Sequence, residues 1–596
     1  MRRTAVVLAL GLVLLAGTIP AVLGFSRGFL TDRTVLASGE VIEGSVLFRG
    51  DTVQVTGPGG SREIPRAEVR EVEPRSVWTG AHAAKALSDP FTWRLLAWTA
   101  GIALLGTLGA VLLGVPFAVW TARTDLPGRG AFSALYAAPL VLPPLLAAMA
   151  WDTVLPRSWV DAPSALGPAG TALQAAALLA LSYFPLVTLF ARRSLAAAGA
   201  SAEEAALLAA GPGAALRRVT LPLARPGILL GALFAFVFCL NDFAVVDFLN
   251  LARPVARQVE VFPFLLQFNF ARKVGGVEEL LVAAIPMALL SLAALAAAIA
   301  IAERPGSGTV GATWRAPRPI PLGPAGRVLG WAFCGAVLAA GCAVPVASLL
   351  AETGGPAAFR LVFQSGTASS ALLLTLGLSL GAVLLAVPTA LVLADAARGA
   401  GREGRLLGGL LAALPLALVP ALVPLGGMHL WDRPWLTGTR GDAPWNAIYD
   451  TPLLAALVVF SRVLPFTLAA TWASLREASP SLHEAAEAAG VPFDLRLRRI
   501  VLPLARPGVA LGALLAFVFA ARELDALSVM TVDTLLKRLW SALHFQRDPT
   551  VAAMAIVLIA LLGSAFALAA ATGWLRPRGY ARGTPAASAS RSSASS

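Results

Sequence analysis

Two acidic side chains that follow long apolar segments are the residues of this sequence best placed for chemistry inside a membrane. Asn241 and Asp242 come directly after the apolar run FAFVFCL, and Arg522 and Glu523 come directly after LAFVFAA. Because a helix rises about 1.5 Å per residue, these acids would lie roughly 25 Å along their helices. A carboxylate at that depth is costly unless it faces a cavity or finds a partner.

Two roles are open for these acids. They could line a solute path or its outer gate, or they could pair along the chain for packing, as Glu523 would with Arg522 or a neighbour. Asp247 and Asp525 could share either role. The residues predicted for a path or gate are Asn241, Asp242, Glu523 and Asp525.

The sequence offers no pattern typical of catalysis, ATP hydrolysis or metal binding. No segment matches G-x4-G-K-[ST], so the phosphate-binding loop of an ATPase is absent. The four histidines are scattered, and the three cysteines lie in apolar runs without the spacing of a zinc site. We therefore expect no catalytic residue, metal or cofactor, and predict that the protein is not an enzyme.

The composition indicates a protein with many membrane-spanning helices. Hydrophobic residues make up 57% of the chain, charged residues 14%, and the mean hydropathy is +0.74. The net charge of +13 does not indicate nucleic-acid binding, because the arginines lie beside the ends of apolar stretches. That placement is typical of cytoplasmic loops, and it predicts that both termini are cytoplasmic.

The sequence repeats itself. Residues 222–238 (PLARPGILLGALFAFVF) return as residues 503–519 (PLARPGVALGALLAFVF), and residues 108–116 (LGAVLLGVP) return as residues 380–388 (LGAVLLAVP). Two repeats in the same order indicate two homologous halves fused in one chain. We predict an all-α polytopic fold of two pseudo-symmetric six-helix halves, an architecture that transporters use.

Apolar windows of spanning length occur twelve times, six in each half. The predicted spans cover residues 4–24, 94–122, 131–151, 170–191, 223–247, 277–302, 326–350, 367–396, 406–430, 450–473, 504–526 and 549–575.

A small extracytoplasmic β domain is predicted after the first span. Short β-branched runs in residues 34–73 alternate with Gly-Glu, Gly-Asp and Pro-Gly-Gly, which is typical of consecutive hairpins. The domain could cap the membrane part by packing or dock a partner. The predicted organisation is a first transmembrane helix (1–25), the β domain (26–90), the first half (91–302) with a loop at 194–222, a cytoplasmic linker (303–325), the second half (326–576) with a loop at 475–503, and a disordered cytoplasmic tail (577–596).

The N-terminal apolar segment has two interpretations. Arg2 and Arg3 followed by an apolar stretch are compatible with a signal peptide. An uncleaved first span is favoured, because its counterpart opens the second half. Each of the two carries a proline near its far end, Pro20 in the first and Pro345 in the second.

The loop at 475–503 carries the most specific motif. It reads Glu484-Ala485-Ala486, three residues, Gly490, nine residues, then Ile500 and, two residues on, Leu502-Pro503. The alanines make a slim helix that a groove can hold closely. Gly490 can take the left-handed conformation that ends such a helix.

This segment matches E-A-A-x3-G-x9-I-x-L-P, and the chain resembles the permeases of type I ABC importers, the binding-protein-dependent transport inner membrane components. The resemblance implies a non-enzymatic subunit of the bacterial inner membrane whose cytoplasmic loops dock on two ABC ATPase subunits. It implies an extracytoplasmic solute-binding protein as a further partner. The chain resembles the permeases that serve ferric iron, thiamine, and related phosphonate or polyamine uptake, in which both halves are sometimes joined in one chain. The expected solute is therefore ferric iron, thiamine or a related small solute.

The first half carries a degraded copy of the motif. Four residues separate Glu204-Ala205-Ala206 from Gly211, whereas the motif has three. Pro212 and Gly213 directly follow Gly211. If Gly211 is replaced by valine, Gly213 can absorb the turn, so Gly490 should matter more than Gly211. The residues that the resemblance assigns to ATPase coupling are Glu484, Ala485, Ala486, Gly490, Glu204, Ala205, Ala206 and Gly211.

Two other classes of membrane protein are compatible with part of these sequence features. A secondary transporter driven by an ion gradient would also show repeats and membrane-embedded acids. A membrane scaffold with a sensory β domain would show the insertion. Neither explains the cytoplasmic loops.

Overall fold

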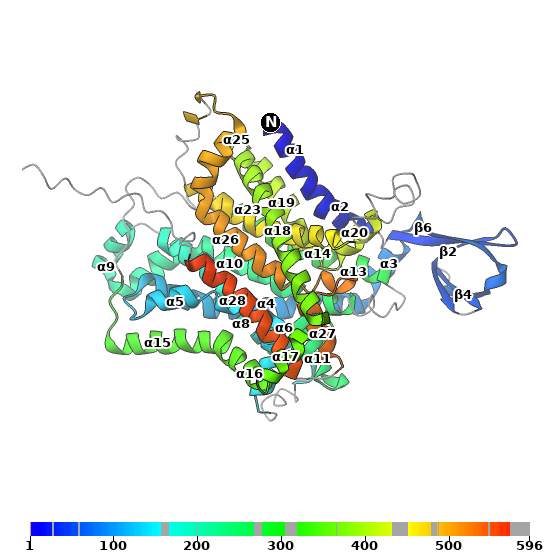
Figure 1. Ribbon diagram of the computed structural model, residues 1–596, viewed down its shortest axis with the longest axis horizontal. Coiled ribbons are helices and arrows are strands. Elements are labelled where there is room, and N and C mark those ends of the chain that lie inside the picture. Colours follow the sequence, from blue (N-terminus) through cyan, green and yellow to red (C-terminus); the bar gives the residue numbers. More distant parts are fainter. Residues whose placement is uncertain are drawn as a thin grey trace, which may run out of the picture.

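The computed structural model shows a bundle of long helices from which a small β domain projects at one end (Figure 1). The described residues are 2–26, 29–49, 51–57, 60–156, 166–197, 200–266, 277–303, 319–364, 366–431, 451–477, 485–486, 488–545 and 549–571. Most of the predicted linker and the whole predicted tail lie outside them.

Each half contains four long helices that occur in the same order as their counterparts in the other half. Those of the first half are α4 (Pro90–Arg123), α8 (Pro168–Ala197), α10 (Leu221–Asn241) and α14 (Ile285–Ala302). Those of the second half are α18 (Gly366–Arg398), α23 (Leu453–Glu477), α26 (Leu502–Ala521) and α28 (Pro549–Ala571). Within the described residues, ten helices are long and apolar enough to cross a membrane. The polytopic all-α fold is confirmed.

Two predicted spans are broken rather than straight. The segments Arg129–Leu140 and Pro144–Val154 meet at 98°, and Arg402–Ala417 and Leu422–Met428 meet at 94°. The continuous spans predicted at 131–151 and 406–430 are therefore wrong, and the total reaches twelve only if each bent pair counts as one span. Prolines stand at both breaks and cannot donate the backbone hydrogen bonds that would carry a helix through. These pairs contain α5 (Arg129–Leu135), α6 (Pro144–Val154), α19 (Arg402–Ala417) and α20 (Leu422–Trp431).

Prolines also explain four π-helical turns. Each turn ends two residues before a proline, which lacks the N–H needed to continue the regular ladder. The turns cover Leu14–Thr18, Leu216–Thr220, Ala339–Ala343 and Leu497–Val501.

The first helix of each half packs against the other half. The N-terminal helix, α1 (Arg2–Val13) continued by α2 (Ile19–Ser26), packs on α18, α20 and α23. Its counterpart, α15 (Pro324–Leu338) continued by α16 (Val344–Glu352), packs on α4 and α6. A Cβ at Gly426 would overlap Pro20 O, so this glycine lets α2 and α20 cross closely. Because each half packs its first helix against the other half, the two halves are held together at two places.

One buried carboxylate adds a polar link between the halves. Glu303, at the end of α14, lies 2.6 Å from Arg405 Nε and accepts a hydrogen bond from Trp472 Nε1 at 2.9 Å. Arg476 Nη1 lies 3.6 Å from the same carboxylate. All three partners belong to the second half, so the last helix of the first half is fastened to α19 and α23.

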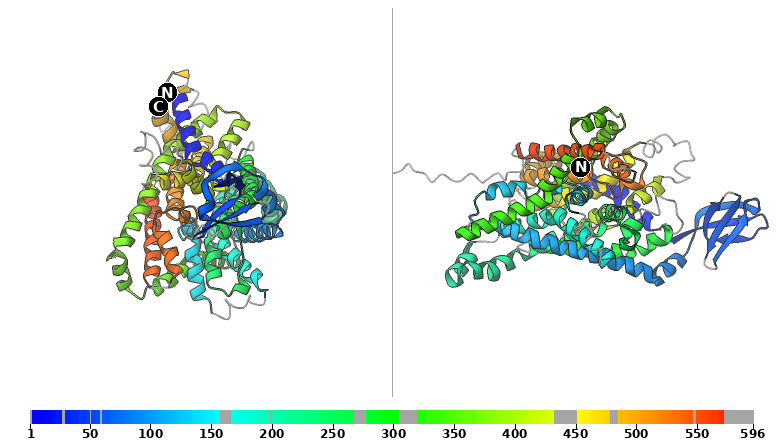
Figure 2. Two further views of the ribbon diagram at one scale, coloured as in Figure 1. Left: turned by 90° about the vertical axis from the view of Figure 1, so that its right-hand side faces the viewer. Right: turned by 90° about the horizontal axis from the view of Figure 1, so that it is seen from below.

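The β domain contains two three-stranded antiparallel sheets with orders β2-β1-β6 and β3-β4-β5. Leu36, Val53, Val55 and Ile64 form its small core. Figure 2 shows it standing apart from the helices. A β insertion after the first helix is therefore confirmed. Its strands are β1 (Leu30–Leu36), β2 (Val41–Glu43), β3 (Ser45–Arg49), β4 (Thr52–Gly57), β5 (Gly60–Pro65) and β6 (Val69–Trp78).

The remaining described helices are short. They are α3 (Ala81–Ser88), α9 (Ala200–Ala215), α11 (Ala244–Leu251), α13 (Val277–Ala283), α17 (Pro356–Gln364), α25 (Phe493–Arg496) and α27 (Leu535–Leu543).

Candidate translocation site between the two halves

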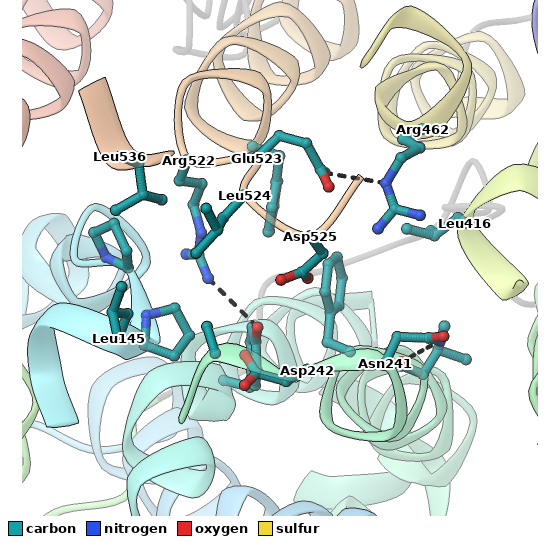
Figure 3. Close-up of a pocket in the computed structure, with 17 residues that line it drawn as sticks. Leu145, Asn241, Asp242, Leu416, Arg462, Arg522, Glu523, Leu524, Asp525 and Leu536 are labelled. Atoms are coloured by element: carbon teal, nitrogen blue, oxygen red, sulfur yellow. Dashed lines mark hydrogen bonds and ion pairs between the residues drawn. The ribbon is translucent and has the colours of Figure 1, made fainter. Parts of the chain in front are cut away.

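The C-terminal ends of α10 and α26 meet at a cavity on the boundary between the halves (Figure 3). Its volume is about 50 Å³, enough for a few water molecules. All four residues predicted for a path or gate line it, and two arginines join them. The polar lining residues are Asn241, Asp242, Tyr183, Arg462, Arg522, Glu523 and Asp525.

Glu523 is paired with an arginine from another helix. Its Oε2 lies 3.0 Å from Arg462 Nε, and both side chains are at most 10% exposed. Glu523 Oε1 also accepts a hydrogen bond from the backbone N–H of Ala526 at 3.0 Å. One of the two sequence interpretations paired Glu523 along the chain with Arg522 or a neighbour, whereas the ion pair in the structure is with Arg462 of α23. Arg522 follows the helix end at Ala521 and points elsewhere.

Arg522 crosses the boundary between the halves. Its Nη1 donates to Leu140 O at 2.8 Å, and its Nη2 donates to Tyr183 Oη at 3.4 Å. Leu140 O has no helical donor four residues on, because that residue is Pro144. The guanidinium therefore satisfies a carbonyl that the break in the first half's bent pair leaves open.

Arg462 makes the corresponding contact in its own half. Its Nη1 donates to Pro415 O at 3.1 Å, in the last turn of α19 before the second bent pair breaks. Pro415 and Pro139 begin the similar segments PLAL and PLVL. Arg462 binds the carbonyl of the first residue of PLAL and Arg522 that of the second residue of PLVL, so the two contacts are one position apart in the repeat. The cavity is thus enclosed by the two breaks and by the arginines that stabilise them.

The two remaining acids differ in their surroundings. Asp242 Oδ1 accepts a hydrogen bond from the backbone N–H of Val245 at 3.0 Å, which stabilises the start of α11. Asn241 donates to Val237 O in its own helix. Asp525 points into the space between the two arginines in Figure 3. Asp247 lies outside the cavity, where its Oδ2 accepts from Trp540 Nε1 at 2.6 Å.

Stacked aromatic rings lie one helical turn before the acids. The Phe238 and Phe519 centroids are 4.9 Å apart with planes at 17°. Tyr183 stacks on Phe238 at 5.2 Å, and Phe466 stacks on Phe519 at 4.6 Å. Since α10 and α26 run from the loops towards the cavity, these rings form a layer between the cavity and the loops.

The two loops that carry the EAA-type segments are described in part. Gly490 has a φ of 68°, which agrees with the left-handed turn predicted there. Gly211 has φ 78° and ψ 173°, and Gly213 lies in the helical stretch that follows. In the unchanged protein Gly211 therefore makes the first turn, and whether Gly213 takes it over when Gly211 is substituted stays a prediction. Glu484 and the side chain of Glu204 lie outside the described residues, whereas Ala205 and Ala485 are exposed and Ala486 is buried.

Several residues of the site were missed from the sequence. Arg462 stands alone among apolar residues, and such a charge is itself a signal of function. Phe238 and Phe519 occupy the same position of the long repeat. This equivalence was the signal that could have predicted their contact, because equivalent residues can meet at a pseudo-two-fold axis. Tyr183 and Phe466 carry no such signal, because their partners lie far away in the chain.

Comparisons with known proteins agree with this architecture. Residues 375–578 match the family of binding-protein-dependent transport system inner membrane components. The chain is 35% identical over 153 residues to a probable molybdenum ABC transporter permease of Haloferax volcanii, covering 24% of this chain and 53% of that protein. It is 34% identical over 162 residues to the molybdenum transport system permease protein ModB of Azotobacter vinelandii, covering 25% and 68%. It is 40% identical over 72 residues to a phosphate transport system permease protein PstA 2 of Mycobacterium bovis, covering 12% and 24%.

The chain thus spans about half of the length of the Haloferax relative and two thirds of the Azotobacter one. These relatives do not support the iron or thiamine import expected from the sequence. Their match, the ten spanning helices and the repeated halves agree on one family. The chain belongs to the binding-protein-dependent transport system inner membrane components, the multi-pass permeases of type I ABC importers.

Proposed function

We propose that this chain forms the solute path of an ATP-driven importer for a tetrahedral oxyanion, with molybdate as the first candidate. The observation that carries the proposal is the cavity on the boundary between the halves. There, the equivalent ends of α10 and α26 converge, and the guanidinium groups of Arg522, just after α26, and Arg462, on α23, line a space enclosed by both halves. The relatives named for molybdenum and phosphate transport support an oxyanion as the solute, since molybdate and phosphate are both tetrahedral oxyanions in water.

The chemistry of the cavity suits such a solute. A guanidinium group is planar, always charged and able to donate two parallel hydrogen bonds to an oxyanion. In the closed state Arg462 is neutralised by Glu523, and Arg522 is held by Leu140 and Tyr183. A passing oxyanion would take over these hydrogen bonds. Asp242, Glu523 and Asp525 would balance the arginine charges after it leaves.

The aromatic layer supplies the barrier below the cavity. Phe238, Phe519 and their stacked neighbours place apolar rings between the cavity and the loops. Opening requires the two halves to move apart at the boundary, as in rigid-body alternating access. Two ATPase subunits docked on the EAA-type loops would drive this motion. In this proposal both termini and both loops are cytoplasmic, and a solute-binding protein delivers the anion from the other side.

Reconstituted transport tests the proposal. The chain, its ATPase and its binding protein would be placed in liposomes, and uptake of labelled molybdate, phosphate, ferric iron and thiamine would be compared with and without ATP. We expect ATP-dependent uptake of molybdate that needs the binding protein. Uptake of iron or thiamine but of neither oxyanion would contradict the substrate class. Uptake driven by an ion gradient without ATP would indicate a secondary transporter instead.

A further inference from the structure

A buried ion pair fastens the second EAA-type loop to α18. Arg496, the last residue of α25, lies after the turn at Gly490, and its Nη2 is 3.1 Å from Asp395 Oδ2 near the end of α18. The two side chains are only 6% and 1% exposed. Apolar side chains of α18, α23 and α26 pack as one cluster in the same region: Leu391, Ala394, Leu475, Val501, Ala505 and Val509.

The opposite part of α18 is bonded to the wall of the cavity. Thr375 Oγ1 accepts a hydrogen bond from the backbone N–H of Leu535 at 2.9 Å, where α27 begins. The next residue, Leu536, lines the cavity. Twenty residues separate Thr375 from Asp395, which is roughly 30 Å of helix. One continuous helix therefore connects the second loop with the cavity.

The first half lacks the residues for this ion pair. In the repeat, Arg123 stands where the second half has Asp395, and Ala215 stands where it has Arg496. The end of α4 is bonded instead to the segment that leads into α15. Ile320 N–H donates to Arg123 O at 2.7 Å, and Leu322 N–H donates to Asp125 Oδ1 at 2.8 Å.

We propose that Asp395 and Arg496 are positioning residues that transmit motion of the second EAA-type loop through α18 to the cavity wall. The pair is suited to this role because separating two buried opposite charges is strongly unfavourable, so loop and helix move together. The apolar cluster alone permits sliding, whereas the ion pair fixes the register. Because Arg123 and Ala215 stand at the equivalent positions, this particular ion pair is specific to the second half. The inference rests on the proposed importer function.

The test measures coupling in proteoliposomes that contain the whole complex. Asp395→Asn should leave ATPase co-purification and basal hydrolysis intact. Binding-protein-stimulated uptake should fall about tenfold, within the usual range of coupling between sites, and more ATP should be spent per solute. Exchanging the charges, with Asp395→Arg and Arg496→Asp together, should restore part of the uptake. The matched control is Arg62→Gln in the exposed Arg62–Glu40 pair of the β domain, which should change nothing.

Unchanged ATP consumption per solute in Asp395→Asn would overturn the proposal. If that variant fails to assemble, Thr375→Val decides, because it leaves the ion pair intact and removes the acceptor at the cavity wall. It should uncouple hydrolysis from uptake in the same way, and normal coupling there would overturn the proposal. Every variant is compared with the unchanged protein on the same solute. Failure of the unchanged protein to import any solute would instead count against the proposed function.

Discussion

Phe238 and Phe519 stack across the boundary between the two halves, with ring centroids 4.9 Å apart. They hold the same position in the repeated segments, so the pseudo-two-fold axis passes between them. A pair related in this way separates when the two halves move apart, whereas contacts within one half do not. We therefore place the barrier to solute at these rings.

Removal of one ring should open this barrier. Phe519→Ala is expected to let solute leak from loaded proteoliposomes without ATP, because the rings on either side of it lose their common partner. Some loss of stability will accompany the leak, since a buried Phe→Ala change costs about 3–5 kcal/mol. Phe190→Ala is the control, because Phe190 stacks on Phe234 within the first half at 5.4 Å. An equal leak from the control would show that loosened packing, not the boundary, is responsible.

The Arg462–Glu523 pair should behave as a coupled unit. Glu523→Gln leaves a buried guanidinium without its counter-charge and should cost about 3–5 kcal/mol of unfolding free energy. Replacing both residues by leucine should cost much less than the sum of the two single changes. Thermal unfolding of the four proteins in detergent measures the cycle. Additive losses would mean that the two side chains do not depend on each other.

The two loop glycines should be sensitive for different reasons. Gly211, with φ 78° and ψ 173°, occupies a region restricted almost entirely to glycine, so Gly211→Val should strain the first loop by about 1–3 kcal/mol. Gly490 has φ 68°, and Gly490→Asn should be tolerated better than Gly490→Val if the left-handed turn is what matters. Co-purification of the ATPase reports both effects. Full ATPase binding by Gly211→Val would show that the first loop contributes little to docking.

Acid should weaken the link between the halves at Glu303. Burial raises the pKa of this carboxyl, but hydrogen bonds from Arg405 and Trp472 and the charges of Arg405 and Arg476 outweigh burial and lower the pKa below its usual 4.5. A lowered pKa adds stability above the unfolded-state value, and that stability is lost as the pH falls through the folded-state value.

Glu303→Gln should therefore reduce stability at neutral pH and leave a smaller further loss on acidification. Unfolding curves recorded from about pH 7 down to about pH 2 would measure both, because the loss falls below the unfolded-state pKa. Glu403→Gln, at an exposed position in the first turn of α19, is the control and should follow the unchanged protein. The same pH dependence with and without Glu303 would contradict this role.

The sequence was sufficient for the features that depend on local pattern. The repeats predicted two halves, apolar length predicted the spans, and alternating β-branched residues predicted the β insertion. It also predicted the four residues Asn241, Asp242, Glu523 and Asp525, which line one cavity. What it could not supply were partners distant in the chain. Arg462 reaches Glu523 from another helix, and Arg522 reaches Leu140 in the other half, so neither contact follows from spacing.

The broken spans were missed for a related reason. Pro143 and Pro420 predict an interruption, but a proline does not determine how far the chain turns. Arg522 and Arg462 bind carbonyls at the two breaks, and these partners are distant in the chain, so the sequence does not predict a turn of more than 90°. Similarly, the spacing around Gly211 does not reveal which of two neighbouring glycines takes the positive φ.

Cross-linking of the two phenylalanine positions tests the central claim most directly. In a protein whose three cysteines have been replaced, Phe238→Cys and Phe519→Cys would be joined by a short reducible cross-linker in assembled proteoliposomes. We predict that the linked complex keeps its ATPase but loses ATP-driven uptake, and that reduction restores uptake. A link between Phe190→Cys and Phe234→Cys within one half should not affect uptake. Undiminished import by the Phe238–Phe519 linked protein would contradict a solute path along the boundary of the two halves.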